Sequence, residues 1–444
     1  MTAVRATPAV DPGLIEAARA VLDGNWTGRS TLPDPTLYPH QWNWDTGFVA
    51  VGRSRYDQAR AETEMVALFD ARWRTGMLPH IVFNPRVSRD AYFPGPDFWL
   101  SGRSPDAPKG VETSGLTQPP VHGFVALEMH RRAGDPDRSR NFLRRLFPGL
   151  AALHRYLRDR RSIGPEGLAY LLHPWESGLD NSPAWDEAIE RFVVVPGTLP
   201  PYERQDLVHA DPRDRPSDQA YDRFVYLALL YRDAGYDDVA VRAVTPFMVE
   251  DPMFNAIWAW SAFSLAAIAE AIGEDGREFA EDGDRIVRGL ESKLWEAEHH
   301  RFFPFDLGDG RQMDHHSIVS FMPLVAPGLD AEMARLTVRA MEESRHCPEG
   351  MRCYVFPSYD IRDEEFNPRL YWRGPVWVNT DWLLYRGCRA VGADSFAEDL
   401  RRSVLELVAA NGFREYFDPH GTSGYGADRF SWTAALFLDL ALGG

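Results

Sequence analysis

Apolar residues recur at helical spacing along most of the chain. Leu14, Ile15, Ala18, Val21 and Leu22 share one face of a segment near the N-terminus, as expected of residues three or four positions apart in an α-helix. The same periodicity predicts helices over residues 58–76, 121–134, 138–160, 219–235, 254–273, 280–295, 331–344, 376–392, 397–412 and 432–442. We therefore expect a mostly helical protein, with one small hairpin where 301–306 precedes a glycine-rich turn.

Glycine followed closely by an acidic residue ends several of these predicted helices. Gly134, Gly235, Gly273 and Gly392 each follow an apolar run. A glycine after the last turn can adopt the left-handed conformation, and the following acid can cap the next helix. The pattern is typical of helical hairpins. Since no linker interrupts about ten to twelve predicted helices, we expect an all-α fold with a single domain over 1–444, in which the helices form a closed double ring, an α/α barrel. An irregular helical fold is the alternative.

Four long stretches lack helical periodicity and are rich in Pro, Gly, Trp, Tyr and Asp. They cover about 27–44, 79–120, 173–215 and 347–374. Long irregular connections in a compact protein usually carry function. Because they alternate with helices, we expect them to gather at one end of the barrel, with loop insertions at about 79–120, 181–215 and 347–374.

Charge and composition exclude several classes of partner. The chain has 48 basic and 65 acidic residues, a formal net charge of −17, so its surface repels nucleic acid and anionic membrane. The apolar segment 254–273 contains polar side chains that suit a buried core helix better than a membrane span. The composition does not indicate whether the chain forms a homo-oligomer, so this possibility stays open.

The cysteines and the glycine motifs bear on location and cofactors. The cysteines, Cys347, Cys353 and Cys388, form neither a disulfide framework nor a metal motif, which favours a reducing compartment. No secretory signal is apparent, so we expect a cytoplasmic protein. No G-x-G-x-x-G or Walker loop occurs, so no nucleotide cofactor is expected. Asp314-His315-His316 resembles part of a metallophosphoesterase motif, but without the rest of that motif we predict no metal site.

The irregular stretches combine aromatic residues with acids. Such clusters occur at 38–45, 175–182, 371–377 and 415–419. Aromatic faces cover the apolar faces of sugar rings, while carboxylates, amides and arginines bind hydroxyl groups. A carbohydrate site is therefore a leading hypothesis, although any single tryptophan or acid is usually a packing residue or a surface charge.

These clusters belong to an ordered series of motifs that extends from about Leu37 to Ala435. The blocks are Leu37–His40 with Trp44-Asp45, Gly76–His80, Tyr92–Pro96, Thr113–Pro120, Trp175–Gly178 with Asp180–Ser182, Arg215–Asp218 with Tyr221, Tyr371–Trp377, and Ser431–Thr433. The chain resembles glycoside hydrolase family 63, and more narrowly the bacterial hydrolases of glucosylglycerate and mannosylglycerate. The resemblance implies an (α/α)6 barrel, inverting hydrolysis of an α-glycosidic bond, and no metal or organic cofactor.

Two carboxylates match the family's catalytic pair. Asp180 matches the general acid and Glu415 the general base. An inverting hydrolase needs one protonated carboxyl for the leaving oxygen and one ionised carboxylate for the attacking water, roughly 6.5–9.5 Å apart. We expect burial against neighbours such as Trp175 to raise the pKa of Asp180.

Other matching positions define the expected substrate-binding residues. Those for the sugar are Tyr38, Trp42, Asp45, Trp175, Gly178, Trp372 and Trp377, and those for the glycerate end are Tyr92, Gln118, Arg215 and Tyr221; His80 and Tyr371 from the same blocks complete the set. A small residue at Gly178 would let the sugar approach the backbone. An arginine can bind the glycerate carboxylate through two N–H groups. The resemblance also implies mobile loops that close over the substrate. The candidates are residues 90–108 and 186–215, which we call the lid segments.

Three other functions stay open. The resemblance departs at Phe430, where the glucosylglycerate hydrolases carry glutamine, and at 375–382, which is closer to broader family members. A neutral glucoside or oligosaccharide is therefore an alternative substrate of a family 63-like α-glucosidase. A sugar epimerase or isomerase would use histidines, of which His40, His80, His122 and His173 are available. A non-catalytic sugar-binding barrel would need the aromatic residues but neither carboxylate.

Overall fold

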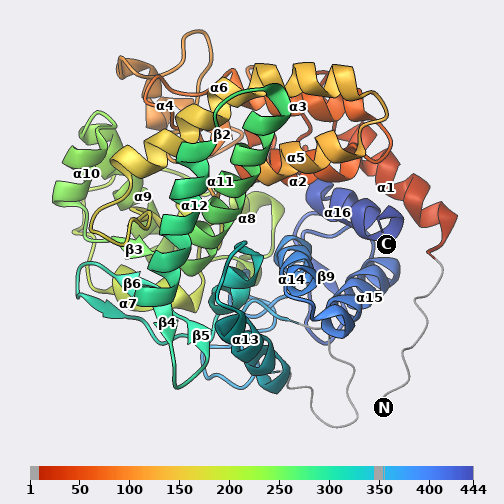
Figure 1. The fold of residues 1–444 in the computed structure, drawn as a ribbon. Coiled ribbons are helices and arrows are strands. Elements are labelled where there is room, and N and C mark those ends of the chain that lie inside the picture. The colour runs from red at the N-terminus through yellow and green to blue at the C-terminus, as the bar shows by residue number, and fades with distance from the viewer. Residues whose placement is uncertain (1–9, 345–353, 355, 444) are drawn as a thin grey trace.

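A computed structural model describes residues 10–344, 354 and 356–443. The part of the chain that it describes is mostly helical, as the periodicity predicts (Figure 1). One set of helices contacts its neighbours in a closed cycle. In order these are α2 (Asn43–Arg53), α5 (His122–Arg132), α11 (Pro252–Ile272), the 3-10 helix η6 (Ile318–Val325), α14 (Val378–Ala390) and α16 (Ser431–Leu442), which returns to α2.

A second set of helices covers the first from outside. Each member packs on one or two inner helices: α1 (Pro12–Gly24) mainly on α16, α3 (Gln58–Phe69) on α2, α6 (Pro136–Arg160) on α5 and α11, α12 (Arg277–Gly289) on α11, α13 (Ala331–Ser344) on η6, and α15 (Asp394–Asn411) mainly on α14. Every residue of α2 is buried, whereas α3 and α12 bury one face. Inner helices are therefore covered on all sides and outer helices are amphipathic.

Helix α11 is long and apolar enough to cross a membrane by length and composition alone. Most of it is buried inside the molecule, as predicted for segment 254–273. Its N-terminus is capped by the Asp251 carboxylate, which accepts the N–H groups of Met253 and Phe254, and it ends at Gly273 with φ +83°. Gly235 and Gly392 also adopt positive φ, whereas Gly134 does not. The left-handed helix end predicted at Gly134 is therefore wrong, because α5 already ends at Ala133 in extended backbone.

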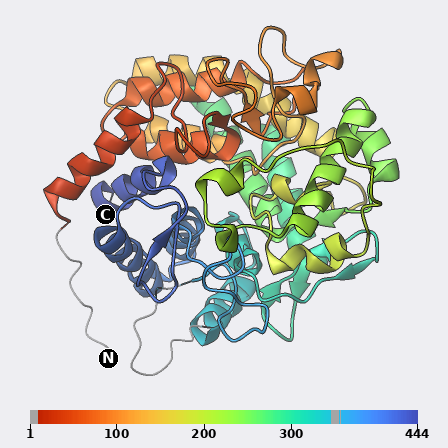
Figure 2. The ribbon, with the colours of Figure 1, turned by 180° about the vertical axis from the view of Figure 1, so that it is seen from behind.

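Short helices and two-residue strands make up the connections. The helices are α4 (Pro96–Trp99), α7 (Asp186–Glu190), α8 (Asp206–His209), α9 (Asp218–Asp233), α10 (Asp238–Val244), and the turns η1 (Ser101–Arg103), η2 (Pro174–Glu176), η3 (Pro183–Trp185), η4 (Pro212–Asp214) and η5 (Leu290–Leu294). The antiparallel pairs are β1 (Gln41–Trp42) with β2 (Ile81–Val82), β3 (Val249–Glu250) with β6 (Phe305–Asp306), β6 with β7 (Arg311–Gln312), β4 (Trp295–Glu296) with β5 (Arg301–Phe302), and β8 (Tyr416–Phe417) with β9 (Gly424–Tyr425). The predicted hairpin is confirmed as β6–β7. The view from behind shows long non-helical connections crossing that face (Figure 2).

Candidate active site

The long connections meet around one cavity. The cavity has a volume of about 100 Å³. Of the expected site residues, it is lined by Tyr38, Trp42, Asp45, His80, Tyr92, Gln118, Trp175, Gly178, Asp180, Arg215, Tyr221, Tyr371, Trp372 and Glu415. Each of the four irregular stretches contributes to this wall, so the fold unites residues that the sequence separates widely.

Asp180 enters the cavity from a tight turn after η2. The turn is built locally: Gly178 has φ +80°, and the Leu179 N–H donates to Ser177 Oγ over 3.0 Å. Burial raises the pKa of Asp180 to about 7; the charge of Arg215 opposes this rise and that of Glu415 adds to it. The Asp180 carboxyl therefore tends to keep a proton near neutral pH.

The neighbouring carboxylate, Glu176, has a different environment. It is fully buried and accepts hydrogen bonds from both Nη atoms of Arg161 at 2.8 and 2.6 Å, from the Tyr231 hydroxyl at 3.0 Å and from the Leu172 N–H at 2.8 Å. Although burial disfavours the charge, the Arg161 guanidinium outweighs it and lowers the pKa of Glu176. Glu176 is a paired structural carboxylate, and Asp180 is the one that lines the cavity.

Glu415 lies just before β8 and is surrounded by donors. The Tyr38 hydroxyl donates to Oε1 over 2.7 Å, while the Ala427 N–H and Arg215 Nη2 donate to Oε2 over 3.1 and 3.2 Å. Burial raises the pKa of Glu415, and all three donors oppose that rise. Burial raises the pKa of both carboxyls, but among the described residues side-chain hydrogen-bond donors oppose the rise directly only at Glu415. The two carboxyls therefore have different surroundings, as the acid and the base of acid–base catalysis require.

Stacked aromatic rings form one wall of the cavity. Trp372 lines it and stacks on Trp377 with ring centroids 3.8 Å apart, and Trp377 stacks in turn on Tyr416. Trp377 therefore lies behind the wall, where it supports Trp372. A side chain at Gly178 would meet the Trp44 ring at 2.4 Å, so packing against Trp44 already requires this glycine.

Asp45, in the first turn of α2, adds a third buried carboxyl to the cavity. Burial raises its pKa well above the ordinary value. His80 also lines the cavity and contacts Ser114 Oγ at 3.2 Å; burial lowers its pKa to about 3, so the ring is neutral.

The histidines do not form an acid–base pair. His40, His122 and His173 lie outside the cavity wall, and burial lowers the pKa of each to about 4. His122 and His173 are engaged by backbone carbonyls of Asn43 and Phe224. This arrangement disfavours an epimerase or isomerase that works through histidine.

Arg215 is a cation that acts on both carboxyls. It is buried, it donates to the Tyr38 hydroxyl over 2.8 Å and to Glu415, and its guanidinium lies 4.6 Å from the centre of the Tyr371 ring. Its Nε has no hydrogen-bond partner among the described residues. Arg215 thus combines a contact to Glu415 with spare donor capacity for an anion.

The two lid segments touch each other at the cavity. The Phe93 ring stacks on Tyr202 with centroids 4.7 Å apart, and the Tyr221 hydroxyl donates to the Phe93 carbonyl over 3.1 Å. Phe93 and Asp206 line the cavity from opposite segments. The Asp206 carboxylate, on α8, is paired with Arg204 and raises the pKa of Asp180.

Several lining residues were not among the site residues expected from the sequence. They are Pro33, Leu37, Trp44, Ala91, Phe93, Gln205, Asp206, Pro216, Phe224, Phe430 and Trp432. Trp44 and Trp432 stand inside the recognised blocks, and Gln205 and Asp206 inside a predicted lid segment. Membership of a motif block was therefore a usable signal for Trp44 and Trp432.

No group of three or more His, Cys, Asp or Glu side chains converges as a metal site among the described residues. His316 of the short Asp314–His316 motif lies 3.6 Å from an Asp363 oxygen. Cys388 is buried, and Cys347 and Cys353 fall outside the described residues.

Comparisons with known proteins agree with this geometry. Residues 38–433 match the family model described as the mannosylglycerate hydrolase MGH1-like glycoside hydrolase domain. Mannosylglycerate hydrolase from Rubrobacter radiotolerans is 42% identical, with 97% of each chain covered, and glucosylglycerate hydrolase from Mycolicibacterium hassiacum is 37% identical, covering 95% of this chain and 97% of its own. A crystal structure of the family 63 mannosylglycerate hydrolase from Thermus thermophilus, in complex with Tris and D-glycerate, has a TM-score of 0.89 and 41% identity over 96% of this chain and 99% of its own.

The fold and the carboxylate-containing cavity are those of a glycosidase. The chain belongs to the MGH1-like glycoside hydrolase family, within glycoside hydrolase family 63. The resemblance found in the sequence is thereby confirmed.

Proposed function

We propose that this enzyme is an inverting α-glycoside hydrolase that cleaves mannosylglycerate or glucosylglycerate into hexose and glycerate. The observation that carries the proposal is one cavity that brings together two buried carboxyls, Asp180 with a raised pKa and Glu415 with three hydrogen-bond donors, beside Arg215. The names of the full-length relatives support the substrate class.

The same proposal includes an (α/α)6 barrel as the scaffold. The closed cycle of inner helices, each covered by an outer helix, supports it. The single domain over 1–444, the cytoplasmic location and the homo-oligomer stay predictions.

Asp180 and Glu415 divide the chemistry. Asp180 donates its proton to the glycosidic oxygen as the bond to the anomeric carbon breaks. Glu415 accepts a proton from the water that attacks the opposite face of that carbon, so the product has the inverted configuration. The raised pKa of Asp180, about 7, suits an acid that must be protonated when substrate binds.

Glycerate is an anion and the protein has a net charge of −17, so the glycerate end of the cavity needs a local positive charge to bind it. In this proposal Arg215 supplies the positive charge, and Tyr92, Gln118 and Tyr221, which line the same cavity, act as neutral polar partners. A carboxylate bound to a guanidinium gains paired charge-assisted hydrogen bonds. Since Arg215 already contacts Glu415, glycerate binding and the ionisation of the base are electrostatically coupled.

One assay tests the proposal. Purified protein is incubated with mannosylglycerate, glucosylglycerate, maltose and trehalose; released hexose is measured, and its anomer is followed by NMR. We expect release from a glycerate glycoside as the β-anomer, and none from the Asp180→Ala variant. Release from maltose or trehalose but from neither glycerate glycoside would refute the substrate class, and an α-anomer would refute inversion.

A further inference from the structure

The loop that carries Tyr38 has almost no regular structure of its own. Between α1 and β1 it is held by isolated bridges, and the Asp34 carboxylate accepts the N–H groups of Thr36 and Leu37 at 2.8 Å each. Tyr38 nevertheless places its hydroxyl 2.7 Å from Glu415 Oε1. Something outside the loop must therefore fix its position.

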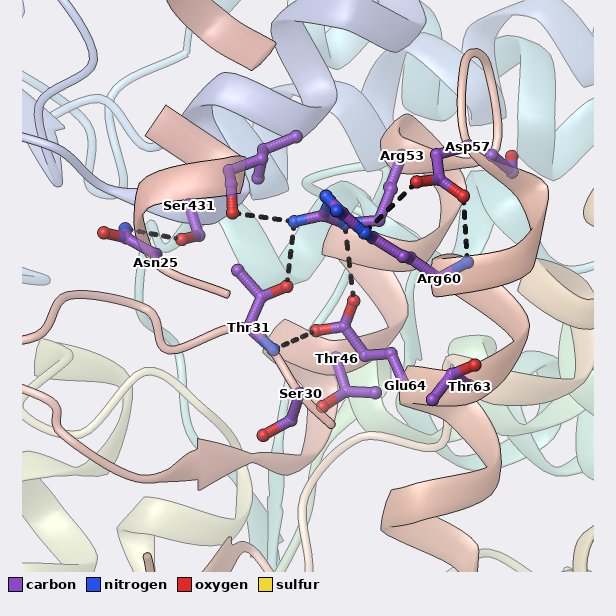
Figure 3. Close-up of polar contacts among 12 residues, drawn as sticks. Asn25, Ser30, Thr31, Thr46, Arg53, Asp57, Arg60, Thr63, Glu64 and Ser431 are labelled. Carbon is purple, nitrogen blue, oxygen red and sulfur yellow. Dashed lines mark hydrogen bonds and ion pairs between the residues drawn. The ribbon is translucent and has the colours of Figure 1, made fainter. Parts of the chain in front are cut away.

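A single residue of α3, Glu64, contacts both ends of this loop, and Figure 3 shows its contacts with Thr31 and Arg53. Its side-chain Oε1 accepts the Thr31 N–H over 2.7 Å, and its backbone carbonyl accepts the Gln41 side-chain amide over 3.1 Å. Gln41 also donates to Thr46 Oγ1 over 3.2 Å. The stretch from Thr31 to Gln41, with Tyr38 inside it, is thus attached to α3 at both ends.

The Glu64 carboxylate is fully buried, and its charge faces Arg53, which is equally buried. Arg53 Nε lies 3.9 Å from Glu64 Oε2, and Arg53 Nη2 donates to Thr31 Oγ1 over 3.1 Å and to the Leu22 carbonyl over 2.8 Å. A buried carboxylate costs free energy unless it is paired and hydrogen-bonded. Burial raises the pKa of Glu64 to about 7, and the charge of Arg53 and the Thr31 N–H oppose this rise. The ionised carboxylate is therefore stabilised by the geometry in which the loop occupies this place.

We propose that Glu64 is a positioning residue that holds the Tyr38 hydroxyl against Glu415. It touches neither the cavity nor the reacting atoms and acts through the loop between Thr31 and Gln41. The inference rests on the proposed role of Glu415 as the general base. Because the Tyr38 hydroxyl lowers the pKa of Glu415, a displaced loop leaves a base that protonates more easily and orients water less well.

The test compares two buried carboxylates on α3. Glu64→Ala removes the acceptor of the Thr31 N–H. Glu62→Ala is the matched control, since Glu62 is also buried and pairs with an arginine, Arg138 at 3.0 Å, without touching the loop. We expect Glu64→Ala to lower kcat about tenfold with little change in KM, as a small misplacement of a catalytic group does. Glu64→Gln, which keeps an acceptor oxygen, should recover most of that loss, and Glu62→Ala should match the wild type.

The pH profile and a double variant separate positioning from loss of stability. The groups that act on Glu415 are Arg215, Tyr38, Asp34 and the backbone N–H of Ala427. Tyr38 and Asp34 both lie in the loop that the Glu64 variant displaces, and the Tyr38 hydrogen bond has the larger effect on the pKa of Glu415. The acidic limb of the kcat profile should therefore move to higher pH. In a Tyr38→Phe background, Glu64→Ala should add no further loss, because the contact is already gone.

Additive losses in that background, an unshifted acidic limb, or no recovery in Glu64→Gln would overturn the inference. If Glu64→Ala does not fold, Gln41→Leu breaks the other attachment, keeps the Glu64–Arg53 pair and should show the same shift. The activity of the wild-type protein and the loss of activity in Glu415→Gln are measured first. If the wild type is inactive or Glu415→Gln is active, the proposed function is refuted, and this inference is refuted with it. If both results are as expected, a wild-type pH profile in Glu64→Ala and in Gln41→Leu refutes only the positioning role of Glu64 and leaves the proposed function intact.

Discussion

Gly426 leaves the space that Glu415 occupies. It follows β9, has φ +65°, and a Cβ built on it would lie 2.1 Å from Glu415 Oε2. The backbone N–H of the next residue, Ala427, donates to that same oxygen. The Gly426→Ala substitution is therefore expected to displace the Glu415 carboxylate, the proposed general base, as well as to strain the turn.

The structure gives the size of the displacement. An ordinary contact needs about 3.4 Å, so Glu415 Oε2 or the turn must move by about 1.3 Å. Misplacement of a catalytic group by about 1 Å costs on the order of a hundredfold in rate. The left-handed backbone adds about 1–2 kcal/mol of destabilisation for any residue with a Cβ.

A matched variant separates the two effects. Gly392 also has positive φ, +76°, but a Cβ there meets nothing within 4 Å. We expect Gly392→Ala to lower Tm modestly with unchanged kcat, and Gly426→Ala to lower kcat about a hundredfold. Steady-state kinetics and thermal unfolding of both variants decide the matter. Equal kcat in the two variants would refute the argument that Gly426 makes room for Glu415.

Five other outcomes follow from the structure. Activity should fall as pH rises through about 7, where Asp180 loses its proton, and a kcat/KM profile of the free enzyme without that limb contradicts the assignment. Because a raised carboxyl pKa destabilises the fold as pH rises through it, Asp180→Asn should raise Tm more at pH 8 than at pH 5. Arg215→Ala should raise KM for glycerate glycosides, spare KM for neutral ones, and move the acidic limb to higher pH, because Arg215 lowers the pKa of Glu415. Glu176→Ala should cost about 3–5 kcal/mol of unfolding free energy in denaturant titrations, since it leaves a buried arginine unpaired. Ligand should slow hydrogen exchange in 90–108 and 186–215; equal exchange with and without ligand refutes the lids.

Helical periodicity located most of the outer helices but missed two inner ones. Neither helix α2 at 43–53 nor η6 at 318–325 was predicted, and all residues of both are buried. A helix that is covered on every side shows no polar face, so its periodicity disappears. The N-terminal boundary of α16 was predicted to within one residue.

The candidate site was predicted mainly through its motif blocks. The structure places nearly all of those residues on one cavity, and it corrects the setting of two. Trp377 supports Trp372 from behind, and Gly178 is required by Trp44. Both differences are matters of packing between distant segments, which no local pattern records.

The sequence by itself determined the helical class, the capping acids Asp135 and Asp237, the family and the candidate catalytic pair, since these depend on local periodicity and on motifs. Only the tertiary structure decided which carboxylates differ in protonation. Glu176 and Asp180 are near neighbours in the chain, yet Arg161 lowers the pKa of the first and burial raises that of the second. It also placed Arg215 against Glu415 and attached the Tyr38 loop to Glu64. A pKa and a contact depend on distance and solvation in space, and these exist only once the chain has folded.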